Sequence, residues 1–187
     1  YRVWVSEIML QQTRVEAVKP FFERFIKALP DVQALSEAPE DELLKLWEGL
    51  GYYNRVRNMQ KAARVIVSEY GGDFPADYEK LLSLPGLGHY TAGAVSSIAF
   101  GIPMPAVDGN VLRVLSRVTA SYEDVLKQSV KTAIEADVKK SIPADRAGDF
   151  NQALIEIGAI VCVPNGKAKC EICPLAFLCE AYKKGIV

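Results

Sequence analysis

The chain has 187 residues, half of them apolar, and its 22 basic side chains are nearly balanced by 23 acidic ones. This length allows one large domain or two small ones with a buried core. A balanced charge excludes a global positive field as the basis of nucleic-acid binding, which would have to come from a local surface. No apolar run of about 18 residues and no signal-peptide pattern is present, so we expect an intracellular protein without a membrane partner.

Apolar residues recur at helical spacing along most of the chain, and Gly or Pro separates the periodic segments. Alternating β-branched runs with hairpin signals are absent, which predicts an all-α fold. The chain starts at Tyr1, almost inside a periodic segment, so we expect further residues upstream. The expected helices are 3–10, 15–29, 39–47, 54–70, 76–83, 89–100, 109–118, 124–140 and 146–161.

Four cysteines lie near the end of the chain, with seven, two and five residues between them. This clustering is too local to brace the whole fold with disulfides, and Pro, Asn and Gly supply turns that let a short segment wrap a compact centre. The pattern favours thiolate ligation of a [4Fe-4S] cluster. The four ligands would be Cys162, Cys170, Cys173 and Cys179.

Zinc is the main alternative for these cysteines, although Cys₄ zinc sites usually contain two C-x₂-C pairs and only Cys170 and Cys173 have that spacing. Two disulfides in a secreted domain are a further alternative. Lys167 and Lys169 lie between the first two cysteines, where a loop held by the cluster could present them to phosphate.

The stretch 84–91 places Gly86 and Gly88 between two expected helices. Glycines let the backbone turn tightly, and the helix that starts near His89 adds its N-terminal dipole, which together predict an anion site. Many helix–helix turns use glycine only to fit, so this signal alone is weak. The loop follows no strand and is too short for a nucleotide-binding Walker loop.

Several ordered motifs together resemble the helix-hairpin-helix DNA glycosylase superfamily. They are Leu84-Pro-Gly-Leu-Gly88, Val107-Asp-Gly-Asn-Val111 and the four cysteines at the end. Ser6-Glu-Ile-Met-Leu-Gln-Gln-Thr13 and Gly49-Leu-Gly-Tyr-Tyr53 narrow the resemblance to the adenine DNA glycosylase (MutY) family. The resemblance covers essentially the whole chain.

The resemblance implies two helical domains, with double-stranded DNA bound in the cleft between them and the target base flipped out. A six-helix domain would span 1–104 and contain the helix-hairpin-helix at about 76–100. The [4Fe-4S] domain would span 105–187. An upstream helix and a downstream domain that recognises 8-oxoguanine, both usual in the family, are not expected within these residues. The gap between Cys162 and Cys170 is one residue longer than the commonest family spacing, which bears on the loop's shape more than on ligation.

Cleaving adenine from deoxyribose requires an acid at the base and an anion near the sugar. Glu7 lies among apolar neighbours, where burial would raise its pKa, and Asp108 lies at the N-cap of the helix 109–118, where backbone amides would keep it ionised. On residue type alone, Glu7 could project into solvent and Asp108 could be only a cap. The resemblance implies that Glu7 protonates adenine and that Asp108 stabilises the positively charged sugar.

Tyr90 stands where superfamily members that also cut the strand place a lysine. A tyrosine cannot form a Schiff base, so the resemblance implies a glycosylase with little or no lyase activity. A partly buried aromatic side chain at a helix start is the structural alternative.

The remaining candidate residues concern DNA geometry and the base pocket. Gln12 and Thr13, at the end of the first helix, could reach the widowed base, and Leu50 and Tyr52 could wedge into the stack or only staple the core. By resemblance, Leu10 and Gln152 line the adenine pocket. Arg113 and Arg117 could meet phosphate or form surface salt bridges.

These residues together predict a monofunctional glycosylase of base excision repair. Its substrate would be adenine opposite 8-oxoguanine or guanine, released by base flipping and acid catalysis, and it would act as a monomer in the bacterial cytoplasm near the nucleoid. A glycosylase for another base, such as thymine in G·T mispairs, is one alternative. A non-catalytic iron-sulfur module that binds DNA or senses redox state is the other.

Overall fold

Side-chain caps and glycine turns set several of the helix ends. Asp31, Asp77 and Asp108 each precede a helix and accept a hydrogen bond from the backbone N–H three residues further on. Such caps satisfy amides that have no partner within the helix. Gly71, at φ +64°, ends the longest helix in the left-handed conformation that glycine adopts readily.

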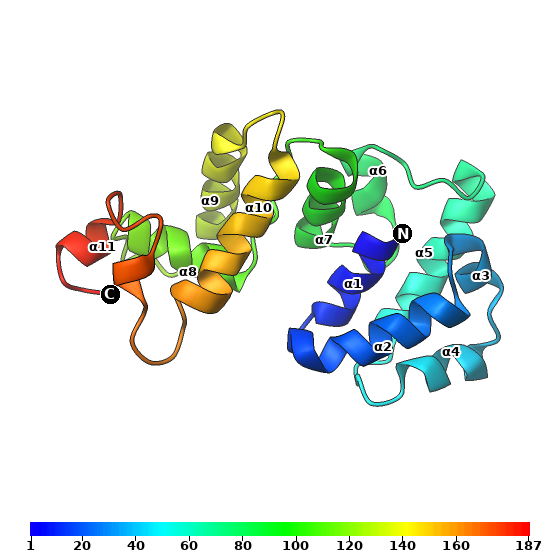
Figure 1. The fold of residues 1–187 in the computed structure, drawn as a ribbon. Helices are drawn as coiled ribbons and strands as arrows, with labels where there is room; N and C mark the ends of the chain where they lie inside the picture. The colour runs from blue at the N-terminus through cyan, green and yellow to red at the C-terminus, as the bar shows by residue number, and fades with distance from the viewer. The chain divides into compact units, whose positions relative to one another are not determined.

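The computed structural model describes all residues, 1–187, and contains helices and no β-strand, which confirms the all-α prediction (Figure 1). The helices 54–70 and 109–118 have the predicted bounds. The elements are α1 (Arg2–Leu10), α2 (Val15–Ala28), α3 (Val32–Glu37), α4 (Glu40–Trp47), α5 (Asn54–Tyr70), α6 (Tyr78–Ser83), α7 (His89–Ala94), η1 (Val95–Ala99), α8 (Gly109–Val118), α9 (Gln128–Ser141), α10 (Ala147–Glu156), η2 (Ile157–Val161), η3 (Cys170–Ile172) and α11 (Glu180–Lys183).

The structure corrects three of the predicted helices. The helices expected over 89–100 and 146–161 are α-helical only in their first part and continue as the π-helical turns η1 and η2. The helix expected from residue 124 begins at Gln128, because Asp124 instead forms a turn that accepts from the backbone of Leu126 and Lys127. The short helices α3, η3 and α11 were not predicted.

The chain divides into two compact units, Tyr1–Ser96 and Ser97–Val187. This division lies within η1, earlier than the expected boundary after residue 104. In the first unit α3 packs against α5, and α1 packs against α2 and α7. Its core contains fully buried aromatic side chains, among them Phe25 and Trp47, whose rings meet edge to face at a centroid distance of 6.0 Å.

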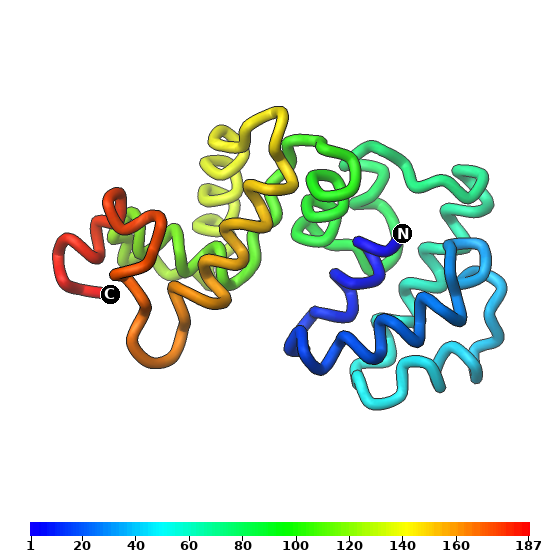
Figure 2. The backbone as a smooth tube through the Cα atoms, in the orientation of Figure 1, coloured from blue at the N-terminus to red at the C-terminus, as the bar shows by residue number.

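The second unit has its own core around α8, which packs against α9, α10, η2 and α11. Its buried apolar residues come mainly from α8, α9 and α10 and include Val111, Val114, Val138 and Leu154. After η2 the chain runs out as a loop, and a hydrogen bond from Lys169 N to Val161 O at 3.0 Å closes the base of that loop (Figure 2).

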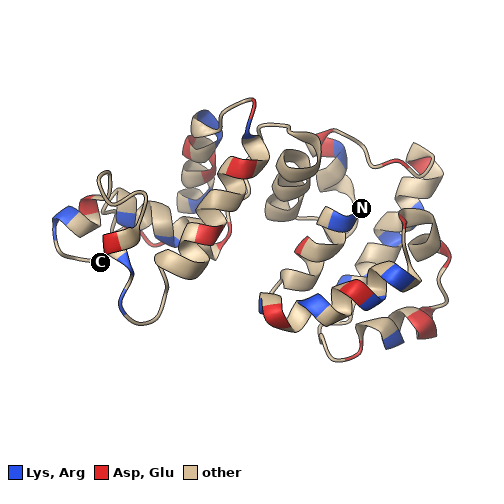
Figure 3. Cartoon of the chain, in the orientation of Figure 1, with Lys and Arg blue, Asp and Glu red and all other residues tan.

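Basic and acidic residues are interspersed along the helices (Figure 3). Lys19 pairs with Glu16 on α2, and Lys140 pairs with Asp137 on α9. This distribution agrees with the nearly neutral composition. No helix of the chain combines the length and the apolar character needed to cross a bilayer.

Candidate functional site

Asp108 is the N-cap of α8, as its position in the sequence predicted. Its Oδ1 accepts from Val111 N at 2.9 Å, and its Oδ2 accepts from Asn110 Nδ2 at 2.7 Å. Both carboxylate oxygens therefore have a donor within α8. Asp108 is half-buried, and these two hydrogen bonds fix the orientation of its carboxylate.

Arg113 connects Asn110, the partner of Asp108, to Cys162 through hydrogen bonds. Its Nη2 donates to Asn110 Oδ1 at 2.8 Å and to Gly158 O at 2.7 Å, while its Nε donates to Cys162 O at 2.8 Å. Arg113 forms no surface salt bridge, and its guanidinium instead joins α8 to η2 and to the cysteine segment. No local pattern in the sequence indicated this role. Its contact with phosphate stays a prediction.

Asn151 is a second residue that the sequence did not single out. It is 1 % exposed, and its amide accepts from Ala106 N at 3.0 Å and donates to Met104 O at 2.9 Å. These bonds tie α10 to the extended segment that leads into Asp108. Gln152, the predicted base-pocket residue, is exposed next to it and donates to Gly148 O at 3.3 Å.

Glu7 lies on α1 of the first unit, next to fully or almost fully buried neighbours such as Val5 and Ile8. Glu7 itself is half-buried, between the full exposure and the burial that its apolar sequence context left open. Leu10, three residues further along α1, is also half-buried. Residues three apart share a helix face, so Glu7 and Leu10 lie on the same side of α1.

The segment 84–88 joins α6 to α7 as a tight hairpin, closed by Leu87 N donating to Leu84 O at 3.2 Å. Gly86 has φ +80°, and a Cβ there would lie 2.7 Å from Cβ of Asn58, so the position requires glycine for both conformation and space. Gly88 is the N-cap of α7. Tyr90 follows in the first turn of α7 and is half-buried.

Arg55 joins two of the segments predicted to contact DNA. Its guanidinium donates to Ile8 O and Gln11 O at the end of α1, at 2.9 and 2.6 Å, and to Leu50 O and Gly51 O at 3.1 and 3.3 Å. Burial lowers the pKa of Arg55. The sequence did not reveal this residue, because its partners lie as far as 47 positions away in the chain.

The residues at these two segments differ in exposure. α1 ends at Leu10, and Gln12 and Thr13 lie in the turn just beyond it, at the end of the first helix as predicted. Gln12 and Tyr52 have φ of 57° and 48°, a strained conformation for residues other than glycine, and both are exposed. Tyr52 is 66 % exposed, whereas Leu50 is 7 % exposed and belongs to the core of the first unit.

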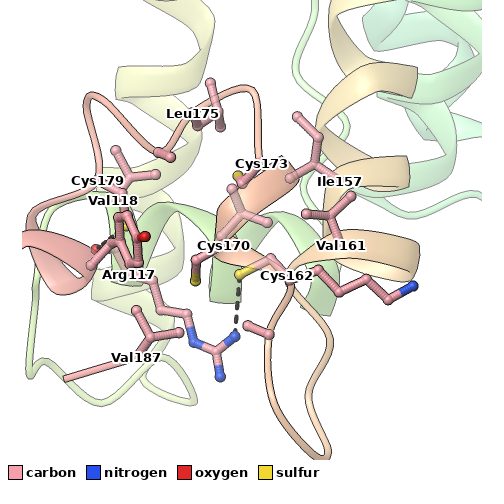
Figure 4. Close-up of a pocket in the computed structure, with 15 residues that line it drawn as sticks. Arg117, Val118, Ile157, Val161, Cys162, Cys170, Cys173, Leu175, Cys179 and Val187 are labelled. Atoms are coloured by element: carbon pink, nitrogen blue, oxygen red, sulfur yellow. Dashed lines mark hydrogen bonds between the residues drawn. The ribbon is translucent and has the colours of Figure 1, made fainter. Parts of the chain in front are cut away.

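The four cysteines line one pocket of the second unit, together with apolar side chains such as Val114 and Leu175 (Figure 4). None of them forms a disulfide. Burial raises the pKa of the Cys170 thiol, and the neighbouring thiols of Cys179, Cys162 and Cys173 raise it further. The structure does not gather three or more of the four sulfurs as ligands of a single ion.

Three basic residues that the sequence singled out lie in or near this pocket. Arg117 donates from Nη1 to Sγ of Cys162 and to Val163 O, both at 3.2 Å, rather than projecting to the surface (Figure 4). Lys167 is exposed and pairs with Glu171 at 3.2 Å. Lys169 is exposed at the rim of the pocket.

Comparison with known proteins gives consistent matches. The profile of the HhH-GPD superfamily of base excision DNA repair proteins matches residues 5–141. The chain is 46 % identical over 185 residues to the adenine DNA glycosylase of Mus musculus, covering 98 % of this chain and 36 % of the mouse protein. Identity is 45 % over 185 residues to the Homo sapiens adenine DNA glycosylase, with 98 % and 34 % covered.

A bacterial relative and two solved structures extend these matches. The adenine DNA glycosylase of Buchnera aphidicola subsp. Baizongia pistaciae is 41 % identical over 182 residues, covering 97 % of this chain and 51 % of that protein. The chain thus spans between about a third and about half of these relatives. The structure of a thermostable thymine-DNA glycosylase matches with a TM-score of 0.87 at 30 % identity, and a non-covalent endonuclease III–DNA complex with 0.82 at 29 %, each over 98 % of this chain and 84 % of the other.

Proposed function

Because the chain belongs to the HhH-GPD superfamily of base excision DNA repair proteins, we propose that it hydrolyses the N-glycosidic bond of adenine opposite 8-oxoguanine or guanine in double-stranded DNA. The observation that carries this proposal is the 41 to 46 % identity, over nearly the whole chain, to proteins named adenine DNA glycosylase. Identity to the thymine-DNA glycosylase and endonuclease III structures is lower, at 30 and 29 %. Adenine is therefore favoured over thymine as the substrate base.

In the proposed reaction, Glu7 is the general acid. Adenine is a poor leaving group, and protonation of a ring nitrogen lets it depart as a neutral base. The half-buried position of Glu7 on α1 supports this role, because it combines solvent access with apolar neighbours. After the base leaves, the same carboxylate would accept a proton from the attacking water.

Asp108 is the proposed anion beside the sugar. Loss of the base develops positive charge on the deoxyribose, and a carboxylate held in advance in a fixed orientation stabilises that charge without reorganisation. The donors Asn110 Nδ2 and Val111 N, which hold the two oxygens of Asp108, support this role.

Tyr90 supports hydrolysis rather than strand cleavage. A strand-cleaving enzyme of this kind uses an amine to form a Schiff base with the sugar, and a phenol cannot form one. The Tyr90 hydroxyl can hydrogen-bond to the sugar or to the phosphate next to it. We therefore propose a monofunctional enzyme.

The proposed DNA contacts come from the hairpin and from the two segments that Arg55 joins. Gly86 and Gly88 would bring backbone amides close to a phosphate. Tyr52 would wedge between bases, with Gln12 and Thr13 at the widowed base, and the strained, exposed backbone at Tyr52 and Gln12 supports this. Leu50 would support the loop from the core. Leu10 and Gln152 are the proposed contacts of the flipped adenine.

Cys162, Cys170, Cys173 and Cys179 would hold a [4Fe-4S] cluster. Four free thiols in one largely apolar pocket fit the donor set of such a cluster. Only Cys170 and Cys173 have the C-x₂-C spacing that zinc sites usually contain twice, which favours the cluster over zinc. The bound cluster would supply a rigid, redox-active tether for the loop between Cys162 and Cys170.

A panel of duplexes tests the proposed function. Purified protein is incubated in single-turnover excess with otherwise identical duplexes that contain A·8-oxoguanine, A·G, G·T or A·T, and base release is measured after alkaline cleavage of the abasic product. We expect adenine release from the first two only, with no strand cleavage before alkali. Release of thymine faster than adenine would overturn the substrate assignment, and no release from any duplex would favour a non-catalytic module.

A further inference from the structure

Arg117, in the last turn of α8, points at the cysteine segment. Its Nη1 donates to Sγ of Cys162 and to Val163 O, both at 3.2 Å, and its side chain lines the pocket that the four cysteines share (Figure 4). None of the ion pairs in the chain includes Arg117. The guanidinium therefore directs its charge at a sulfur rather than at a carboxylate.

The backbone N–H, the carbonyl and the sulfur of Cys162 each form a hydrogen bond. Its N–H donates to Ile157 O at 2.7 Å, its carbonyl accepts from Arg113 Nε at 2.8 Å, and its sulfur accepts from Arg117. Arg113 and Arg117 are one turn apart on α8, so they reach the same segment from one helix face. Arg113 fixes the backbone of Cys162, and Arg117 alone contacts its sulfur.

Arg117 contacts a second cysteine of the pocket through its backbone, since its carbonyl O accepts from Sγ of Cys179 at 3.4 Å. Arg117 therefore meets two of the four cysteines. A cationic donor forms a strong, charge-assisted hydrogen bond to a thiolate ligand.

We propose that Arg117 is a positioning residue for the cysteine-ligated centre, which holds the Cys162 thiolate in its ligating orientation and stabilises the reduced state of the centre. This inference rests on the proposed cluster. Hydrogen bonds to ligand sulfurs and nearby charge set the reduction potential of iron-sulfur centres. A cation that bonds to a ligand sulfur favours the more negative, reduced state, so its removal lowers the potential.

Lys169 provides the matched control, since it lines the same pocket and carries the same charge. No hydrogen bond joins its side chain to a sulfur in the structure. If the charge alone set the reduction potential, removal of either cation would shift the potential by a similar amount. If the hydrogen bond to Cys162 sets it, removal of Arg117 would shift the potential more than removal of Lys169.

The experiment compares the holoprotein with the variants Arg117→Met, Arg117→Lys and Lys169→Met. Reduction potential is measured by voltammetry on a DNA-free electrode, with iron content and the rate of iron loss in air measured alongside. We expect a clear shift to lower potential and faster iron loss for Arg117→Met, a smaller shift for Arg117→Lys, and little change for Lys169→Met. Equal potentials for wild type and Arg117→Met, or an equal shift for Lys169→Met, would overturn the inference.

Two controls separate this inference from the proposed function. If the wild-type protein holds iron and releases adenine, but its reduction potential equals that of Arg117→Met, only the inference fails. If the wild type binds no iron, the cofactor assignment fails, and the inference fails with it. Far-UV circular dichroism reports folding, and should Arg117→Met not fold, an unchanged potential in Arg117→Lys would overturn the inference.

Discussion

Asn110 donates from Nδ2 to Oδ2 of Asp108 at 2.7 Å, while its own amide oxygen accepts from Nη2 of Arg113 at 2.8 Å. Gly158 packs against Asn110 from η2, so closely that a Cβ at Gly158 would lie 2.5 Å from Cβ of Asn110. The orientation of the proposed anionic residue therefore depends on a helix cap, an arginine and a glycine that all belong to the second unit.

Asp108→Asn tests charge separately from capping. Asparagine is as good an N-cap as aspartate, so we expect stability to change by no more than about 1 kcal/mol. The amide lacks the charge, and it turns either a donor or a weaker acceptor towards Asn110, so base release should slow by about 10² to 10³-fold, as for other lost electrostatic contacts. Single-turnover release and urea unfolding measure the two effects.

Asp31→Asn is the control for this variant, because Asp31 caps α3 through Ala34 N at 2.8 Å in the same way. It should leave base release unchanged. An Asp108→Asn protein that releases adenine at the wild-type rate would show that Asp108 is only a helix cap.

Glu7→Gln removes the proposed general acid with little change of shape. General acid catalysis contributes about 10² to 10⁴-fold, so adenine release should fall by at least that factor while affinity for the A·8-oxoguanine duplex is retained. Release kinetics and a gel-shift titration measure the two quantities. Glu16→Gln, at an exposed carboxylate on α2 that pairs with Lys19, should behave as wild type. Normal release by Glu7→Gln would remove Glu7 from the mechanism.

Tyr90→Lys should add an activity. An amine at this position of α7 could attack the sugar, so borohydride treatment during turnover should trap a covalent protein–DNA adduct that the wild-type protein does not form. Denaturing electrophoresis detects the adduct, and Tyr90→Phe serves as the control without an amine. A trapped adduct in the wild-type protein would contradict a monofunctional mechanism.

The sequence predicted those features that depend on neighbouring residues. The apolar stripe over 54–70 and the aspartate cap at Asp108 are local, and both are confirmed. Arg55, Asn151 and Arg113 bind partners more than 40 positions away, and no local pattern signals such contacts. The π-helical turns were also missed, because their apolar spacing resembles that of an ordinary helix.

Leu50 and Tyr52 should separate core support from DNA contact. Leu50→Ala should destabilise the protein by about 2 to 5 kcal/mol, as truncation of a buried leucine does. Tyr52→Ala should leave the unfolding midpoint nearly unchanged and weaken mispair binding and base flipping, since the ring is exposed. Urea unfolding and 2-aminopurine fluorescence of the duplex measure these effects. Unchanged flipping in Tyr52→Ala would exclude its ring as a wedge.

Asn151 and Gln152 are adjacent on α10 and should respond oppositely. Asn151→Ala leaves the buried Ala106 N without its partner, at a cost of about 1 to 3 kcal/mol, and also removes the bond to Met104 O. Gln152→Ala alters an exposed side chain and should change stability by less than about 0.5 kcal/mol. It should instead slow adenine release, because the amide is a proposed contact of the flipped base.

Urea unfolding and single-turnover adenine release, measured on both variants, test these two expectations. A stable Asn151→Ala protein would contradict the assigned role of the buried amide, and full activity in Gln152→Ala would remove Gln152 from the base pocket.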